Sequence, residues 1–173
     1  AYTRYLAFYY AEVGRDNDTK GNGYSVRCVR NVEGSGSEGG GDNEGGDDNP
    51  DDNDTTIDAQ PCPGAPTVTD VDGNVYNTVQ IGEQCWMREN LRTTKYANGT
   101  TIPLRITTSS ATAYRYYPAN NSANVSDYGY LYNWKALMNG AASSSANPSG
   151  VQGICPDGWH VPSDAEWTEL TNY

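Results

Sequence analysis

The single histidine of the chain, His160, is the first residue that could carry acid–base chemistry, because imidazole titrates near neutral pH. It follows Trp159 and lies three residues after Asp157. Nucleophilic catalysis would also need a serine or cysteine in a recognisable motif, and none accompanies it. The nearby Cys155 precedes a proline, a setting that favours a disulfide partner. The pattern predicts a structural role for His160 and a protein that is not an enzyme.

The four cysteines are widely spaced, and no CxxC pair occurs among Cys28, Cys62, Cys85 and Cys155. Zinc sites usually use closely spaced ligand pairs, so disulfides are the favoured reading. Disulfides would place the protein in an oxidising, extracytoplasmic compartment. Cys62 and Cys85 flank the first hairpin of the longer segment and are expected to pair. The partner of Cys28 would then lie outside the chain, or be Cys155 of an adjacent molecule.

Ten of the 22 acidic residues fall between Glu33 and Asp58, a stretch that has no Lys or Arg. This stretch also lacks aromatic residues and is rich in glycine, so it cannot bury enough apolar area to offset the cost of ordering. We expect a self-repelling solvated linker without a cofactor. Its Asp-rich half could instead bind calcium, although it lacks the glycine and closing glutamate of an EF-hand loop. Outside it the charges nearly balance. No part of the sequence resembles the clustered Lys and Arg that neutralise phosphates, so we do not expect nucleic acid as a partner.

Six tyrosines in a polar stretch form a candidate ligand-binding surface, since aromatic faces bind sugars and proteins with little entropy loss. They are Tyr114, Tyr116, Tyr117, Tyr128, Tyr130 and Tyr132. The alternative is that about half of them fill the core.

Short strands would position these residues. Residues 1–10 and 22–30 are predicted to pair as a hairpin across the turn-rich residues 14–22, and such a hairpin needs a sheet to join. Two alternating runs around Asp72-Gly73 predict a second hairpin. Another short strand follows it, and then a turn at Asn98-Gly99.

Two helices are expected among long polar connections. Leu131, Trp134, Leu137 and Met138 recur at the spacing of one buried helical face. Ser163 and Glu166 form a capping box that opens a second helix, with Trp167 and Leu170 facing inward. Together these elements predict an α+β domain with a twisted antiparallel sheet. No run approaches the roughly 20 apolar residues of a membrane span.

Four separated motifs resemble the Fibrobacter succinogenes major paralogous domain: "GYSVRCVR", "VTDVDGNVYNTVQIGEQCWMRENLRTTKYANGTTIP", "YGYLYNW" and "CPDGWHVPSDAEWTEL". The resemblance implies a C-type-lectin-like fold related to that of formylglycine-generating enzymes. It also implies a surface or secreted protein of Bacteroidota, where Asp54-Thr55-Thr56 resembles an O-glycosylation acceptor at Thr55.

The motif order differs from that of the family, in which the "SVRCVR" strand comes last. We therefore expect residues 1–32 to be the C-terminal hairpin of a preceding or neighbouring copy. Residues 33–60 would be an acidic Gly/Asp-rich linker, and residues 61–173 the N-terminal and middle part of a following copy.

These features predict a non-enzymatic extracellular module of a repeated bacterial surface or secreted protein. It would act in adhesion or display, with a glycan or protein as ligand. The alternative is a structural filament subunit whose partners are other copies of itself, each completed by a neighbour's terminal hairpin.

Overall fold

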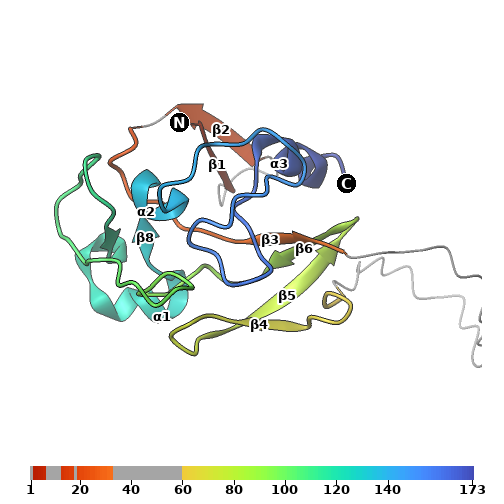
Figure 1. Cartoon of the computed structure of the whole chain (residues 1–173), viewed down its shortest axis with the longest axis horizontal. Helices are drawn as coiled ribbons and strands as arrows, with labels where there is room; N and C mark the ends of the chain where they lie inside the picture. Colours follow the sequence, from red (N-terminus) through yellow and green to blue (C-terminus); the bar gives the residue numbers. More distant parts are fainter. Residues whose placement is uncertain (1, 7–12, 18, 33–59) are drawn as a thin grey trace, which may run out of the picture.

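A computed structural model describes residues 2–6, 13–17, 19–32 and 60–173 of the chain. Its main feature is a four-stranded antiparallel sheet with the strand order β3-β6-β5-β4. The strands are β3 (Val29–Asn31), β4 (Thr67–Thr69), β5 (Val75–Ile81) and β6 (Gln84–Met87). Figure 1 shows them side by side, with most helices and long loops away from them. This arrangement confirms a mixed α+β domain.

The hairpin predicted around Asp72-Gly73 is present as β4 and β5. Val68 lies opposite Tyr76 in its register. Gly73 adopts a φ of 84°, and its N–H donates to the carbonyl of Asp70 at 3.0 Å. Glycine suits this turn because a side chain is disfavoured at positive φ. The predicted strand β6 and the turn at Gly99, whose φ is 83°, are also present.

The N-terminal region differs from expectation. β1 (Tyr2–Leu6) pairs with β2 (Val13–Asn17), so its predicted pairing with residues 22–30 is wrong. Most of β2 lies within residues 14–22, which we expected to form a turn. The local sequence indicates a turn there, but pairing with a neighbouring strand outweighs such a local preference.

Residues 29–31 join the main sheet of their own chain, and Tyr24 upstream of them bridges Tyr132. Within β3, Val29 lies opposite Trp86 of β6. On the other side of the strand, Val29 exchanges backbone hydrogen bonds of 3.0 and 2.9 Å with His160. Our expectation that the segment is foreign to this sheet is therefore wrong for the folded chain. The physical reason is that the sheet leaves a strand position beside β6, which β3 fills.

The remaining elements are short and lie between long loops. They are β7 (Arg115–Tyr116), η1 (Pro118–Asn120), η2 (Ser122–Asn124), α1 (Val125–Tyr128), β8 (Leu131–Tyr132), α2 (Trp134–Met138) and α3 (Asp164–Thr171). β7 pairs with β8, so Leu131 belongs to a strand and not to the expected helix.

The capping box predicted at the start of α3 is present. The Ser163 side chain accepts from the Glu166 N–H at 3.2 Å, and the Glu166 carboxylate accepts from the Ser163 N–H at 2.8 Å. The inward face of α3 differs from the prediction, because Glu166 is its buried residue while Trp167 and Leu170 are only partly buried.

One hydrophobic core joins the N-terminal segment to the later residues. Val26 and Cys28 pack in the same cluster as Tyr76, Met87 and Tyr132. All five are at most 6 % exposed, so Val26 and Cys28 are as deeply buried as the core residues they contact. No helix among the residues that the structure describes has the length and apolar character needed to cross a bilayer.

Candidate functional site

A cleft of about 360 Å³ is the larger of the two principal hollows in the described part of the chain. Residues 19–27 form one wall, and residues of α2 form another. The loop around residues 143–151 and the start of α3 close the remaining sides. The volume lies near the small end of the roughly 300–1,000 Å³ range of small-molecule sites.

Aromatic side chains give the cleft its character. Tyr24, Trp134 and Trp167 line it and come from three separate parts of the chain. Lys20 places its Nζ 5.5 Å from the centroid of the Trp134 ring, close enough for a cation–π attraction. Hydroxyls and amides, including those of Ser144 and Asn22, share the same walls. The cleft thus combines flat apolar surfaces with hydrogen-bonding groups.

Backbone hydrogen bonds fix the walls relative to each other. Tyr24 and Tyr132 exchange two bonds, of 3.0 and 2.9 Å. The Trp134 N–H donates to the Lys20 carbonyl at 3.2 Å, which ties the start of α2 to the N-terminal segment. Trp167 packs on Trp86 of the sheet, with ring centroids 4.9 Å apart. The aromatic lining is therefore anchored to the sheet and to the core.

The six predicted tyrosines do not form one surface. Tyr116 and Tyr132 are buried, with 5 % and 2 % of their surface exposed, whereas Tyr128 is 58 % exposed. Tyr114, Tyr117 and Tyr130 are partly buried. Tyr117 stacks on Tyr130 at a centroid distance of 5.8 Å. Only Tyr132 contributes to the cleft.

Sequence reasoning missed most of the cleft. We assigned Trp134 and Trp167 to the core and gave Tyr24 and Lys20 no role. The available signal was the aromatic residues of the N-terminal segment, but it could not be interpreted without knowing where that segment packs.

His160 has a structural setting. Its Nε2 lies 2.5 Å from the Glu166 Oε1, and the Glu166 side chain is fully buried. Burial raises the pKa of Glu166, but hydrogen bonds from His160 and from the Ser163 N–H outweigh it and hold the pKa below its ordinary value. The other Glu166 oxygen also accepts from the Ser149 N–H at 3.1 Å. The backbone of His160 bonds to Val29 of β3, and its side chain bonds to Glu166 of the capping box. The His160–Glu166 pair therefore connects β3 to the start of α3.

Asp70 organises the turn between β4 and β5, and Asp72 connects that turn to Thr94 and Lys95. Asp70 accepts from the Tyr76 hydroxyl at 2.6 Å, and Tyr76 also accepts the Arg92 N–H at 2.9 Å. Burial raises the pKa of Asp72, but bonds from Thr94 and the charge of the neighbouring lysine lower it to about 2. The Asp70 carboxylate accepts from the Asp72 and Asn74 N–H groups within the turn, whereas the Asp72 carboxylate accepts from Thr94 and pairs with Lys95, both outside it.

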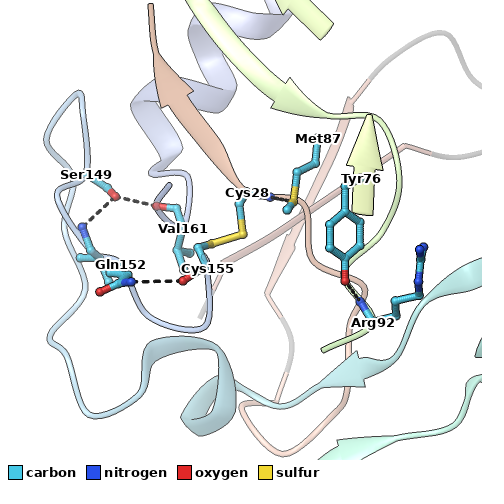
Figure 2. The surroundings of a disulfide bond; sticks show 9 residues. Cys28, Tyr76, Met87, Arg92, Ser149, Gln152, Cys155 and Val161 are labelled. Carbon is cyan, nitrogen blue, oxygen red and sulfur yellow. Dashed lines mark hydrogen bonds between the residues drawn. A yellow bond between two sulfur atoms is a disulfide. The ribbon is translucent and has the colours of Figure 1, made fainter. Parts of the chain in front are cut away.

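Both disulfides lie in the core. Cys62 bonds to Cys85, which is the pair expected from the sequence. Cys28 bonds to Cys155 of the same chain, with Cα atoms 5.9 Å apart. Figure 2 shows this second bond beside Met87, whose Sδ accepts from the Cys28 N–H at 3.4 Å. The N-terminal segment is thus held covalently as well as by hydrogen bonds.

The proposed calcium site in the acidic linker and the glycosylation site at Thr55 lie outside the described residues. Within the described ranges, no group of three or more His, Cys, Asp or Glu side chains is placed to hold a metal ion.

The family model of the Fibrobacter succinogenes major domain matches residues 79–173, more than half of the chain. The chain therefore belongs to this family, in agreement with the resemblance carried by its motifs. Comparisons with curated proteins and with solved structures each give no match.

Proposed function

We propose that the chain is a non-enzymatic extracellular binding module of a repeated bacterial surface or secreted protein, and that the cleft receives a glycan. The observation that carries this proposal is the lining of the cleft by Tyr24, Trp134 and Trp167. Sugar rings present apolar C–H faces that stack on aromatic rings, while their hydroxyls bond to serine and asparagine side chains. Both kinds of surface occur in the cleft.

Other features support the extracellular setting and the lack of catalysis. Two buried disulfides suit an oxidising compartment. His160 is engaged by a buried carboxylate that also closes a helix cap, which supports a structural role. The curled sheet, few helices and long loops support the C-type-lectin-like assignment as part of the same proposal.

The test is binding of the full chain to a panel of soluble oligosaccharides, followed by titration calorimetry of the best one. Loss of one stacking ring in Trp134→Ala should weaken binding by roughly two- to tenfold, since such a contact contributes about 0.5–1.5 kcal/mol. The matched control is Tyr128→Ala, an exposed aromatic residue outside the cleft lining. Thermal unfolding of each variant checks that the fold is kept. Equal affinity in Trp134→Ala, or no oligosaccharide bound by the parent chain, would reject the glycan proposal.

A further inference from the structure

Residues 19–32 are bonded to other parts of the fold along their length, and Val26, Cys28 and Val29 are buried in its interior. β3 pairs with β6 along one side, and on its other side Val29 exchanges two backbone hydrogen bonds with His160. Upstream, the Val26 carbonyl accepts from the Leu91 N–H at 2.8 Å. Without this segment, two neighbouring parts of the chain would lose their backbone partners at once.

Side chains of the segment also contribute to the core and to the cleft. Cys28 and Val29 are fully buried and Val26 is 6 % exposed. Tyr24 pairs with Tyr132 and supplies part of the cleft wall. The later residues therefore need this segment both to close the core and to complete the cleft.

The chain that joins the segment to the rest is far longer than the gap it spans. The Val32 N–H donates to the Glu83 carbonyl, and the Gln60 carbonyl accepts from the Gln80 N–H. These ends lie on either side of the β5–β6 hairpin, about three strand spacings or roughly 14 Å apart. About five extended residues would cover that distance. Residues 33–59 supply 27.

The extra length gives the segment a reach beyond its own domain. Fully extended, 27 residues span up to roughly 90 Å, whereas a domain of this size has a radius of gyration of roughly 14 Å. The ten acidic residues between Glu33 and Asp58 carry like charges with no Lys or Arg among them, so they repel one another. A second copy therefore lies within reach of the same segment.

We propose that residues 19–32 are a donor segment that also completes the fold of a second copy of the chain. In the joined form, β3 of one copy pairs with β6 of the other, and Cys28 of one bonds to Cys155 of the other. All contacts inside the domain are the same in both arrangements, so concentration decides between them. The covalent connection of 27 residues holds the segment near its own copy at an effective concentration of roughly millimolar order, which other copies must match. Exchange is favoured where copies are crowded, as in tandem or on one surface.

This exchange also assembles the cleft from two copies, because residues 19–27 line one wall and residues of α2 and α3 line the others. Each copy both donates and accepts, so the contact closes into a reciprocal dimer or continues head to tail. The proposal rests on the fold and does not require that the ligand be a glycan.

The covalent step is an ordinary thiol oxidation. The Cys28 and Cys155 thiols lose two protons and two electrons in total as the S–S bond forms. An organic disulfide such as oxidised glutathione takes up both and leaves as two thiols.

The test uses two full-length variants that cannot form the Cys28–Cys155 bond alone. Cys28→Ala lacks the donor thiol, and Cys155→Ala lacks the acceptor thiol. One is isotopically labelled, and both are unfolded, reduced and refolded together at high concentration with oxidised and reduced glutathione. We expect a disulfide-linked heterodimer whose cross-linked peptides contain Cys28 of one chain and Cys155 of the other, in several-fold excess over both homodimers.

The matched control is the pair Cys62→Ala and Cys85→Ala. Both of these cysteines lie outside the donor segment, so its exchange does not bring them together across copies. This mixture should give no excess of heterodimer. A Cys28/Cys155 mixture that yields only monomers, or heterodimer no more abundant than homodimers, would overturn the proposal.

A second variant covers the case in which the single-cysteine chains fold poorly. It keeps all four cysteines and replaces residues 33–59 with one glycine, too short to cross roughly 14 Å. We expect folded dimers or longer assemblies linked through Cys28–Cys155, as measured by light scattering and non-reducing electrophoresis. A folded monomer with this bond, or a chain that never folds at any concentration, would contradict the donor segment.

Discussion

The two disulfides close loops of very different length, and this difference predicts their contributions to stability. Cys28 and Cys155 are 127 residues apart in sequence, whereas Cys62 and Cys85 are 23 apart. In the chain-entropy model, a cross-link stabilises by restricting the unfolded chain, more so for a longer loop. The estimate is about 5 kcal/mol for the longer loop and about 3.5 kcal/mol for the shorter.

The comparison uses two double variants, Cys28→Ala/Cys155→Ala and Cys62→Ala/Cys85→Ala. All four cysteines are at most 2 % exposed, so the loss of buried sulfur is similar in both variants and cancels in the comparison. We expect the first variant to lose about 1.5 kcal/mol more unfolding free energy than the second, or about a tenfold difference in the unfolding equilibrium constant.

Urea unfolding followed by tryptophan fluorescence measures both losses. The protein is kept at low micromolar concentration, and light scattering verifies that it is monomeric, so that each disulfide closes a loop within one chain. Equal losses, or a larger loss from the shorter loop, would refute the reasoning. Such a result would mean that the connection between residues 32 and 60 does not act as a flexible loop in the unfolded state.

Three further predictions concern the turn and the loops. Tyr76→Phe removes the hydroxyl that donates to Asp70 at 2.6 Å and leaves the Arg92 N–H without its acceptor. Urea unfolding should show a loss of about 2–3 kcal/mol in unfolding free energy. A loss below about 0.5 kcal/mol would contradict this prediction. Since the folded pKa of Asp72 is depressed to about 2, its stabilisation is complete above about pH 4 and lost as the pH falls toward 2. Asp72→Asn should remove that pH dependence of the unfolding free energy. Its size is at most about 2 kcal/mol, because the side chain keeps some solvent contact. An unchanged profile of stability against pH would contradict this prediction. Gly153→Ala should lower thermal stability far more than Gly64→Ala, because both glycines have positive φ but only the added Cβ at Gly153 would clash with a backbone oxygen, that of Leu137. Equal shifts in the melting temperature would refute this prediction.

Local signals in the sequence were sufficient for features made by neighbouring residues. The Asp72-Gly73 turn, the capping box at Ser163 and the Cys62–Cys85 pair all involve residues close in sequence or flanking one hairpin. Their geometry depends on backbone preferences that a short stretch encodes.

Features that depend on distant residues were not predictable in this way. Val29 lies between β6 and His160, and periodicity shows that a strand exists but not which strands it joins. The same limit hid the cleft, whose aromatic residues Tyr24, Trp134 and Trp167 come from separate parts of the chain. Glu166 was recognised as a cap, but its complete burial follows from packing against His160.

The position of β3 between β6 and His160 also sets the order of events during synthesis. Val29 leaves the ribosome early, yet its partner His160 is made roughly 7–26 s later at roughly 5–20 residues per second. Throughout that interval β3 lacks at least one of its two backbone partners, β6 and His160, so the domain acquires its final shape only when nearly all of the described chain has been translated.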